Sequence, residues 1–234
     1  LQILYEGRTS DDALNDKHGF ETSFENLFKH RTAEELLAIK KKYGATGDIL
    51  EAKNRIDAIG KDIVSHYLEH IYPNQFKAQV VCSSKLAAVR YQQAIHAALK
   101  AHVEVLKAAT QPDLEQIKRV EFLKAAVVIS ADGTNEAAYI TQARKQAREI
   151  NAVDNFCRSF DLDNPDKADT GIAFLIVCDM LLTGFDAPIE QVMYIDKKMR
   201  EHTLLQAIAR TNRVKKGKSR GYIVDYIGLT ENLT

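Results

Sequence analysis

The chain has 234 residues, of which 45% are hydrophobic and 27% charged, and its formal net charge is zero. This composition is typical of a soluble globular protein with a sizeable core. The balanced charge does not by itself imply a nucleic-acid partner, although it still permits a local basic groove. The three cysteines show no zinc or disulfide spacing, and no apolar run approaches the length of a membrane span, so we expect a cytoplasmic protein.

The beginning of the chain differs in pattern from the rest. A strand-like run at residues 1–5 opens the sequence without an initiator methionine or a signal core, so we expect a piece of a longer protein. We interpret residues 1–24 as an N-terminal strand and connector. Residues 25–75 show helical patterns at 33–43 and 48–71, the second with Asp48 as its N-cap, and indicate a helical insertion or connector.

Residues 76–234 alternate between strand and helix patterns. Short apolar runs rich in Val and Ile lie at 78–83, 125–130, 173–179, 191–196 and 221–226. Helical patterns occupy 84–101, 112–124 and 135–150, and an acidic stretch at 160–171 predicts a surface loop. Unbroken apolar runs suit strands buried on both faces. The sequence therefore predicts an α/β domain with a parallel sheet and right-handed crossovers.

The segment FLIVCDMLLTGFDAP at 174–188 places a loop directly after a buried strand. Loops at the carboxyl ends of parallel strands form the ligand crevice of open α/β sheets. Gly184 permits a close backbone approach, and Asp186 offers a carboxylate for a ribose hydroxyl or an arginine. A tight turn with a capping aspartate is the simpler alternative.

A second strand-to-helix junction lies at 78–91. Ser83 or Ser84 is expected to cap the following helix. A helix N-terminus that carries hydroxyl groups is also a suitable phosphate site, for a nucleotide or for a nucleic-acid backbone.

The predicted helix at 204–213 carries three polar side chains on one side. With Gln206 at zero, Arg210 falls at roughly 40° and Arg213 at roughly −20° around the helix, while Leu204 and Thr211 fall on the opposite side. The pattern indicates one buried side and one side that holds two guanidinium groups outward. A solvated helix face is the alternative.

Several common chemistries are not supported by the sequence. The Gly-Lys-Ser in 215–221 is no P-loop, because Asn212 stands where the motif needs glycine, and no other P-loop or acidic box is present. There is also no H-E-x-x-H, C-x-x-C or G-x-S-x-G pattern. We therefore expect that this chain has no metal site and does not bind a nucleoside triphosphate by itself.

The strand with its T-G-F-D loop, the next strand and the Q-x-x-x-R-x-x-R helix together resemble the second RecA-like domain of superfamily 2 helicases and translocases. The fit extends further to the motor (R) subunit of type I restriction–modification enzymes, through YEGR near the start, residues 76–95, and GYIVDYIGL at 221–229. The resemblance is strong over 76–100 and 172–229 and weak over 10–70. It implies a RecA-like α/β domain.

The resemblance assigns nucleotide roles to five positions. Arg210 and Arg213 match catalytic arginines that reach the γ-phosphate of ATP bound mainly by a first RecA-like domain. Gln206, Gly184 and Asp186 match nucleotide-binding positions of the same motifs. Planar guanidinium donors suit the charge that spreads over the γ-oxygens during phosphoryl transfer.

It also assigns contacts to the DNA backbone. Ser83, Ser130 and Thr183 match the positions that would touch DNA phosphates. Two positions depart from the helicase pattern. Cys178 replaces a phosphate-binding threonine with a weak donor, and Ala209 replaces a glycine.

The implied cofactors are ATP and Mg²⁺, and the implied partners are double-stranded DNA, the first RecA-like and nuclease domains of the same subunit, and methyltransferase and specificity subunits. We expect the isolated chain neither to hydrolyse ATP nor to cut DNA. Two alternatives stay open: an α/β module whose arginines dock a carboxylate patch of another protein, and a small-molecule enzyme that acts on a phosphorylated substrate.

Overall fold

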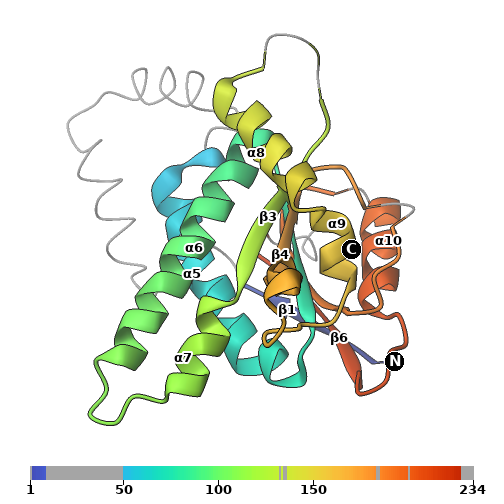
Figure 1. Cartoon of the computed structure of the whole chain (residues 1–234). Helices are drawn as coiled ribbons and strands as arrows, with labels where there is room; N and C mark the ends of the chain where they lie inside the picture. Colours follow the sequence, from blue (N-terminus) through green and yellow to red (C-terminus); the bar gives the residue numbers. More distant parts are fainter. Residues whose placement is uncertain are drawn as a thin grey trace, which may run out of the picture.

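The computed structural model describes residues 2–8, 50–131, 133, 136–182, 185–199 and 201–227, without the side chains of 201, 202, 207 and 208. Six strands form one parallel sheet in the order β1-β6-β5-β2-β4-β3 (Figure 1). Their bounds are Gln2–Gly7, Lys77–Cys82, Lys124–Val128, Ile172–Val177, Glu190–Asp196 and Arg220–Asp225 for β1 to β6. Each apolar run in the sequence became one of these strands, which confirms the predicted parallel α/β sheet.

The helices connect the strands over both faces. They are α5 (Lys53–His66), α6 (Lys85–Lys107), α7 (Leu114–Glu121), α8 (Ala138–Glu149), α9 (Ala152–Cys157) and α10 (Glu201–Thr211). A π-turn (Tyr67–Ile71) and a 3₁₀ turn (Tyr72–Asn74) extend α5, and a further 3₁₀ segment (Pro165–Gly171) lies within the predicted acidic loop. The predicted helix at 33–43 and the cap at Asp48 lie outside the described residues.

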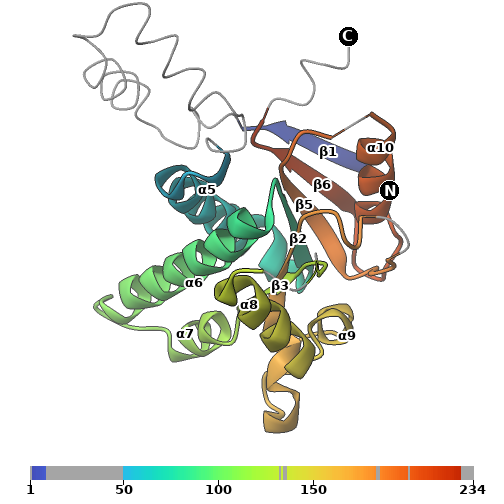
Figure 2. The ribbon, with the colours of Figure 1, turned by 90° about the horizontal axis from the view of Figure 1, so that it is seen from above.

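The two faces of the sheet build two apolar layers. In β2, Ala78 and Val80 point to a core shared with α5, α6 and α7, whereas Val81 points to a second core with α9 and α10. This alternation is the period-two geometry of a strand that is buried on both sides. Viewed from above, α5, α6 and α7 lie on one side of the sheet, and α9 and α10 on the other (Figure 2).

The starts of α6 and α7 follow the expected capping chemistry. Ser84 caps α6, because its hydroxyl accepts a hydrogen bond from the Ala87 amide at 3.1 Å. Asp113 caps α7 in the same way through the amide of Gln116 at 3.0 Å. The first of the paired serines is therefore not needed for the cap.

Helix α5 is a layer of the domain rather than a separate unit. Ile56, Ile59 and Ile63 are at most 1% exposed and belong to the core that β2 builds. Arg55 pairs through both terminal nitrogens with Asp196 at the end of β5, at 2.7 and 2.5 Å. The described part of the predicted connector thus shares the sheet's core, while the boundaries at 24 and 75 stay predictions. None of the helices within the described ranges has the length and apolar character to cross a bilayer.

Candidate functional site

The loop after β4 crosses one face of the sheet. It leaves the carboxyl end of β4 after Val177 and reaches the amino end of β5 at Glu190, and both strands run parallel to β2. Its described residues include Leu182 and Ala187, which are buried in the core beneath α9 and α10. Asp186 therefore lies on this face, near the amino end of β5, and not in the crevice at the carboxyl ends. Thr183 and Gly184 lie outside the described residues.

Arg210 joins α10 to this loop. Its Nε donates to the carbonyl oxygen of Leu182 at 2.8 Å, and its Nη1 donates to the carbonyl oxygen of Phe185. Burial lowers the pKa of Arg210, an effect reinforced by Arg213 and opposed by the carboxylates of Glu190 and Asp186. We call these two hydrogen bonds the Arg210 clamp. Because a guanidinium has five N–H donors, the clamp leaves donors of Arg210 for a ligand.

Arg213 is the more exposed of the two arginines. Its Nε lies 3.6 Å from Oδ1 of Asp186, and the side chains are 54% and 60% exposed. Such a solvent-exposed pair holds its partners weakly. The guanidinium of Arg213 is therefore accessible to an anion that approaches this face.

The position of Arg213 differs from the one predicted. Helix α10 ends at Thr211, two residues before Arg213, so a continuous helix does not carry both arginines. A turn in which the Arg213 amide donates to the Arg210 carbonyl at 3.1 Å keeps them adjacent. Leu204 and Thr211 are buried, as the helical pattern predicts, and Gln206 is exposed one turn before Arg210.

Two buried titratable side chains near Arg210, Lys218 and Glu190, were not predicted. Lys218 is 5% exposed, and its Nζ donates to the carbonyl oxygens of Pro188, at 3.3 Å, and Glu190. Burial raises the pKa of Glu190 to about 8, against the opposing charges of Lys218 and Arg210. Burial likewise lowers the pKa of Lys218 to about 8, with Glu190 opposing. A Gly-Lys-Ser turn gives no indication that its lysine is buried, so the burial of Lys218 could not be predicted from the sequence.

The two predicted DNA-contact residues that the structure describes, Ser83 and Ser130, lie elsewhere, at the carboxyl edge of the sheet. Ser83 follows β2, and its Oγ is buried without a hydrogen-bond partner among the residues described. Ser130 follows β3, is exposed, and accepts a hydrogen bond from Arg144 on its carbonyl at 2.9 Å. The structure thus brings Arg210, Arg213 and Asp186 together and separates them from the two serines.

The described residues differ in how well they suit the two cofactors. Arg210 and Arg213 provide donors of the type that bind phosphate oxygens. For Mg²⁺, the described ranges contain no group of three or more His, Cys, Asp and Glu side chains that could hold an ion.

Comparison with known proteins places the chain in a family. A model of the type I restriction enzyme subunit R domain 3 matches residues 74–228. The chain belongs to this family. This R-subunit domain is 35% identical over 192 residues to MjaVIIP of Methanocaldococcus jannaschii, named as a candidate type I restriction enzyme endonuclease subunit; the match covers 80% of the chain and 16% of that protein. It is 32% identical over 189 residues to the type I restriction enzyme HindI endonuclease subunit of Haemophilus influenzae, which covers 79% of the chain and 16% of that subunit.

A solved structure supports the same assignment at the level of the fold. The fragment structure of a candidate HsdR subunit of a type I restriction enzyme from Vibrio vulnificus matches all of the R-subunit domain and 33% of its own chain, with a TM-score of 0.53 and 16% identity. The domain spans about a sixth of the two curated relatives above, at 16% of each. The activity and partners of a whole subunit are therefore matters for a proposal.

Proposed function

We propose that this domain is the second RecA-like motor domain of the ATP-dependent DNA translocase and endonuclease subunit of a type I restriction enzyme. The observation that carries the proposal is the exposed guanidinium of Arg213, set beside Asp186 on the face where Arg210 binds the loop after β4. An open face with accessible arginines suits a phosphate that a neighbouring domain presents. A small-molecule enzyme would instead need a site closed by its own residues.

In this proposal the two arginines have complementary tasks. Arg213 donates to the γ-phosphate of ATP and stabilises the negative charge that develops on its oxygens during transfer. Arg210 fixes the loop to α10 and can turn its remaining donors to the same phosphate. Asp186, 3.6 Å from Arg213, orients the guanidinium until the nucleotide arrives.

The remaining cofactor and partner assignments are proposals of the same kind. ATP and Mg²⁺ would be held mainly by a first RecA-like domain of the same subunit, whose P-loop this chain does not contain. Double-stranded DNA would run along the carboxyl edge that carries Ser83 and Ser130. A nuclease domain, and methyltransferase and specificity subunits, would complete the complex.

The proposal is tested in the full-length subunit, assembled with its methyltransferase and specificity subunits. Arg213→Ala is expected to lower DNA-stimulated ATP hydrolysis by about 10³-fold or more and to stop translocation, with DNA binding nearly unchanged. The matched control is Arg119→Ala on α7, because Arg119 pairs with Glu115 at 54% and 59% exposure, almost the values of Arg213 and Asp186. Translocation that persists in Arg213→Ala would overturn the proposed role.

The isolated chain gives a second test. Without a P-loop, it should show no steady ATP hydrolysis, with or without duplex DNA. DNA-stimulated ATP hydrolysis by the chain alone would contradict the proposal that a first RecA-like domain binds the ATP.

A further inference from the structure

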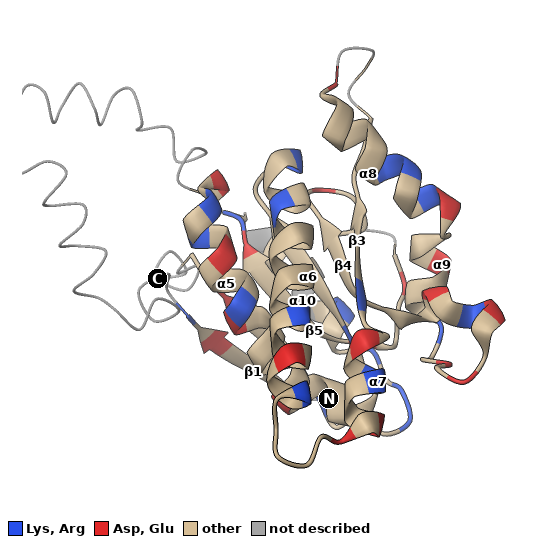
Figure 3. Ribbon diagram, turned by 60° about the vertical axis from the view of Figure 1, so that its left-hand side comes forward, with Lys and Arg blue, Asp and Glu red and all other residues tan. Residues whose placement is uncertain are grey.

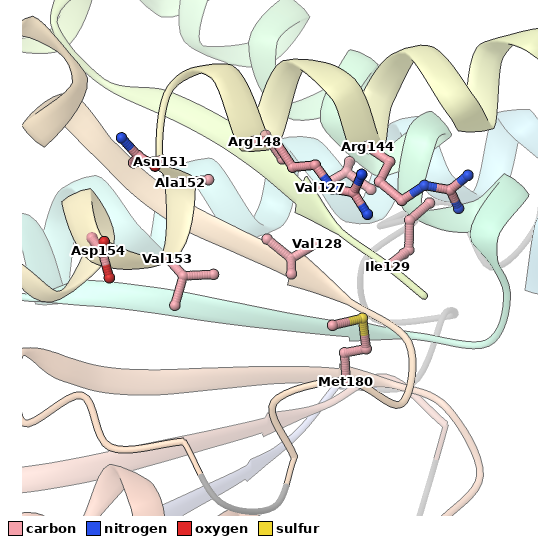
Figure 4. Close-up of a pocket in the computed structure, with 11 residues that line it drawn as sticks. Val127, Val128, Ile129, Arg144, Arg148, Asn151, Ala152, Val153, Asp154 and Met180 are labelled. Carbon is pink, nitrogen blue, oxygen red and sulfur yellow. The ribbon is translucent and has the colours of Figure 1, made fainter. Parts of the chain in front are cut away.

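A hollow of about 340 Å³ lies at the β3 edge of the sheet, away from Arg210 and Arg213. Its wall is formed by the end of β3, by α8 and by the start of α9, and Met180 from the loop after β4 faces them (Figure 4). The hollow adjoins the carboxyl ends of β3 and β4, where Ser130 also lies. Neither the sequence patterns nor the proposed nucleotide contacts include it.

Two arginines of α8, one turn apart, line the hollow. Arg144 is held in place, because its Nη1 donates to the Ser130 carbonyl at 2.9 Å and its Nη2 to the carboxylate of Glu136. Arg148 is exposed, and its guanidinium makes no hydrogen bond or ion pair with any residue that the structure describes, while its backbone carbonyl accepts from the Asn151 amide at 3.1 Å. Figure 4 shows both guanidinium groups toward the same end of the hollow. One arginine is thus fixed and its neighbour is available.

The nearby acidic groups do not neutralise Arg148. Glu136 is shared by Arg144 and by Lys85, whose Nζ lies 2.8 Å away. Glu149 lies 3.7 Å from Lys145, and Asp154 lies at the opposite end of the hollow (Figure 4). Figure 3 shows the positive residues gathered along the second half of α8. An anion that enters at the arginine end therefore meets a positive potential.

The floor of the hollow has a different chemistry. Val128, Ile129 and Met180 give it an apolar surface, and Met180 is 37% exposed. A ligand with an anionic group next to an apolar ring or sugar would match both parts of the hollow. A sugar–phosphate backbone has this combination, with one phosphate for each sugar.

We infer that this hollow binds a backbone phosphodiester of DNA through Arg148, with Arg144 beside it and the sugar against Met180. The inference rests on the proposed function for the identity of the nucleic acid. Arg148 supplies a sequence-independent contact that sets the position of the strand at the carboxyl edge. Arg144 donates to Ser130 and Glu136 and thereby fixes the position of α8 relative to the end of β3.

The test measures fluorescence anisotropy of a labelled duplex DNA titrated with the 234-residue chain, from about 50 to 200 mM salt. Arg148→Ala is expected to weaken binding roughly five- to tenfold at the low end and to lower the slope of log K against log salt by about one. The control is Lys100→Ala, an exposed cation on α6 that lies outside the hollow. Lys100→Ala should leave the slope of log K against log salt unchanged. Circular dichroism checks that both variants are folded, and Arg148→Lys should recover part of the lost affinity.

The outcomes separate this inference from the proposed function. If the parent chain binds DNA and Arg148→Ala binds it with the same affinity and the same salt slope, the hollow is not a phosphate site. The proposed motor function would not be affected by that result. Equal losses in Arg148→Ala and Lys100→Ala would also overturn it, since general charge would then explain the binding. A parent chain that does not bind DNA even at low salt would contradict both.

Discussion

Arg210 in the last turn of α10 donates from Nε to the carbonyl oxygen of Leu182 in the loop after β4, at 2.8 Å. A second nitrogen of the same guanidinium donates to the carbonyl oxygen of Phe185. The two carbonyls flank residues 183 and 184, so one side chain holds both sides of the loop's centre. Helix and loop therefore act as one unit, from which Arg213 and Asp186 project.

The clamp formed by Arg210 should contribute to stability as well as to function. Arg210→Ala leaves two carbonyl oxygens without this donor, and we expect a loss of about 1–3 kcal/mol in the free energy of unfolding by urea. Arg210→Lys should recover little, because an ammonium cannot reproduce the geometry of the guanidinium fork. Arg213→Ala is the internal control, expected to cost at most about 1 kcal/mol because its ion pair is exposed. Equal losses at the two positions would contradict the clamp.

The contact between the end of α10 and β6 depends on a glycine. A Cβ at Gly221 would lie 2.6 Å from the carbonyl oxygen of Thr211, whereas one at Gly7 would meet its nearest atom, Cε1 of Tyr5, at 3.9 Å. We expect Gly221→Ala to destabilise the chain by roughly 1–3 kcal/mol through overpacking and Gly7→Ala to have little effect, as judged by thermal unfolding. A Gly221→Ala chain as stable as the parent would show that α10 is not held this closely.

The pair between Arg55 and Asp196 should be a strong link between α5 and the sheet. Their side chains are 11% and 2% exposed, and Tyr91 also donates to Asp196, at 2.5 Å. Arg55→Ala would leave a buried carboxylate without its cation, at a cost of about 3–5 kcal/mol. Lys53→Ala removes an exposed pair with Asp57 from the same helix and should cost under about 1 kcal/mol in the same denaturant titration. Similar values for the two variants would mean that α5 is not fixed through Asp196.

The buried amine of Lys77 predicts a defined pH dependence. Its Nζ donates to the carbonyl oxygens of Asn155 and Thr170 at 3.0 and 2.8 Å, and burial lowers the pKa of Lys77 from 10.5 to about 7. Between these two pH values the unfolded chain binds more protons than the folded chain, so the free energy of unfolding should rise with pH. This contribution is complete above the unfolded pKa and is lost as the pH falls toward 7.

The measurement compares urea unfolding of the parent chain and Lys77→Met between pH 7 and 10. The parent should gain stability relative to the variant by up to about 1.4 kcal/mol for each pH unit in this window. Parallel pH profiles would show that Lys77 keeps its ordinary pKa in the folded chain.

The sequence predicted the sheet well because each strand is a separate, unbroken apolar run, as at 173–179 and 191–196. It missed α9, which has six residues and follows Asn151 in the left-handed conformation, since so short a helix shows no clear periodicity. The end of α10 was placed two residues too late because no glycine or proline marks it. Boundaries of this kind depend on tertiary contacts.

The candidate site was only partly accessible to sequence reasoning. Asp186 and the two arginines could be grouped because their segments resemble successive motifs of the second RecA-like domain of superfamily 2 helicases. The burial of Lys218 and the hollow beside Arg148 depend on contacts between distant segments, such as Met180 facing α8, and no local pattern encodes them.

The central claim, that Arg213 acts on the transferring phosphate, is tested most directly by nucleotide affinity in the full-length subunit. The quantities to compare are the Kd for ADP–aluminium fluoride, which mimics the transition state, and the Kd for ADP, in the parent and in Arg213→Ala. If Arg213 acts mainly in the transition state, Arg213→Ala should raise the Kd of the analogue by about 10²-fold or more and leave the Kd of ADP nearly unchanged. Equal effects on both ligands, or none on either, would contradict the account.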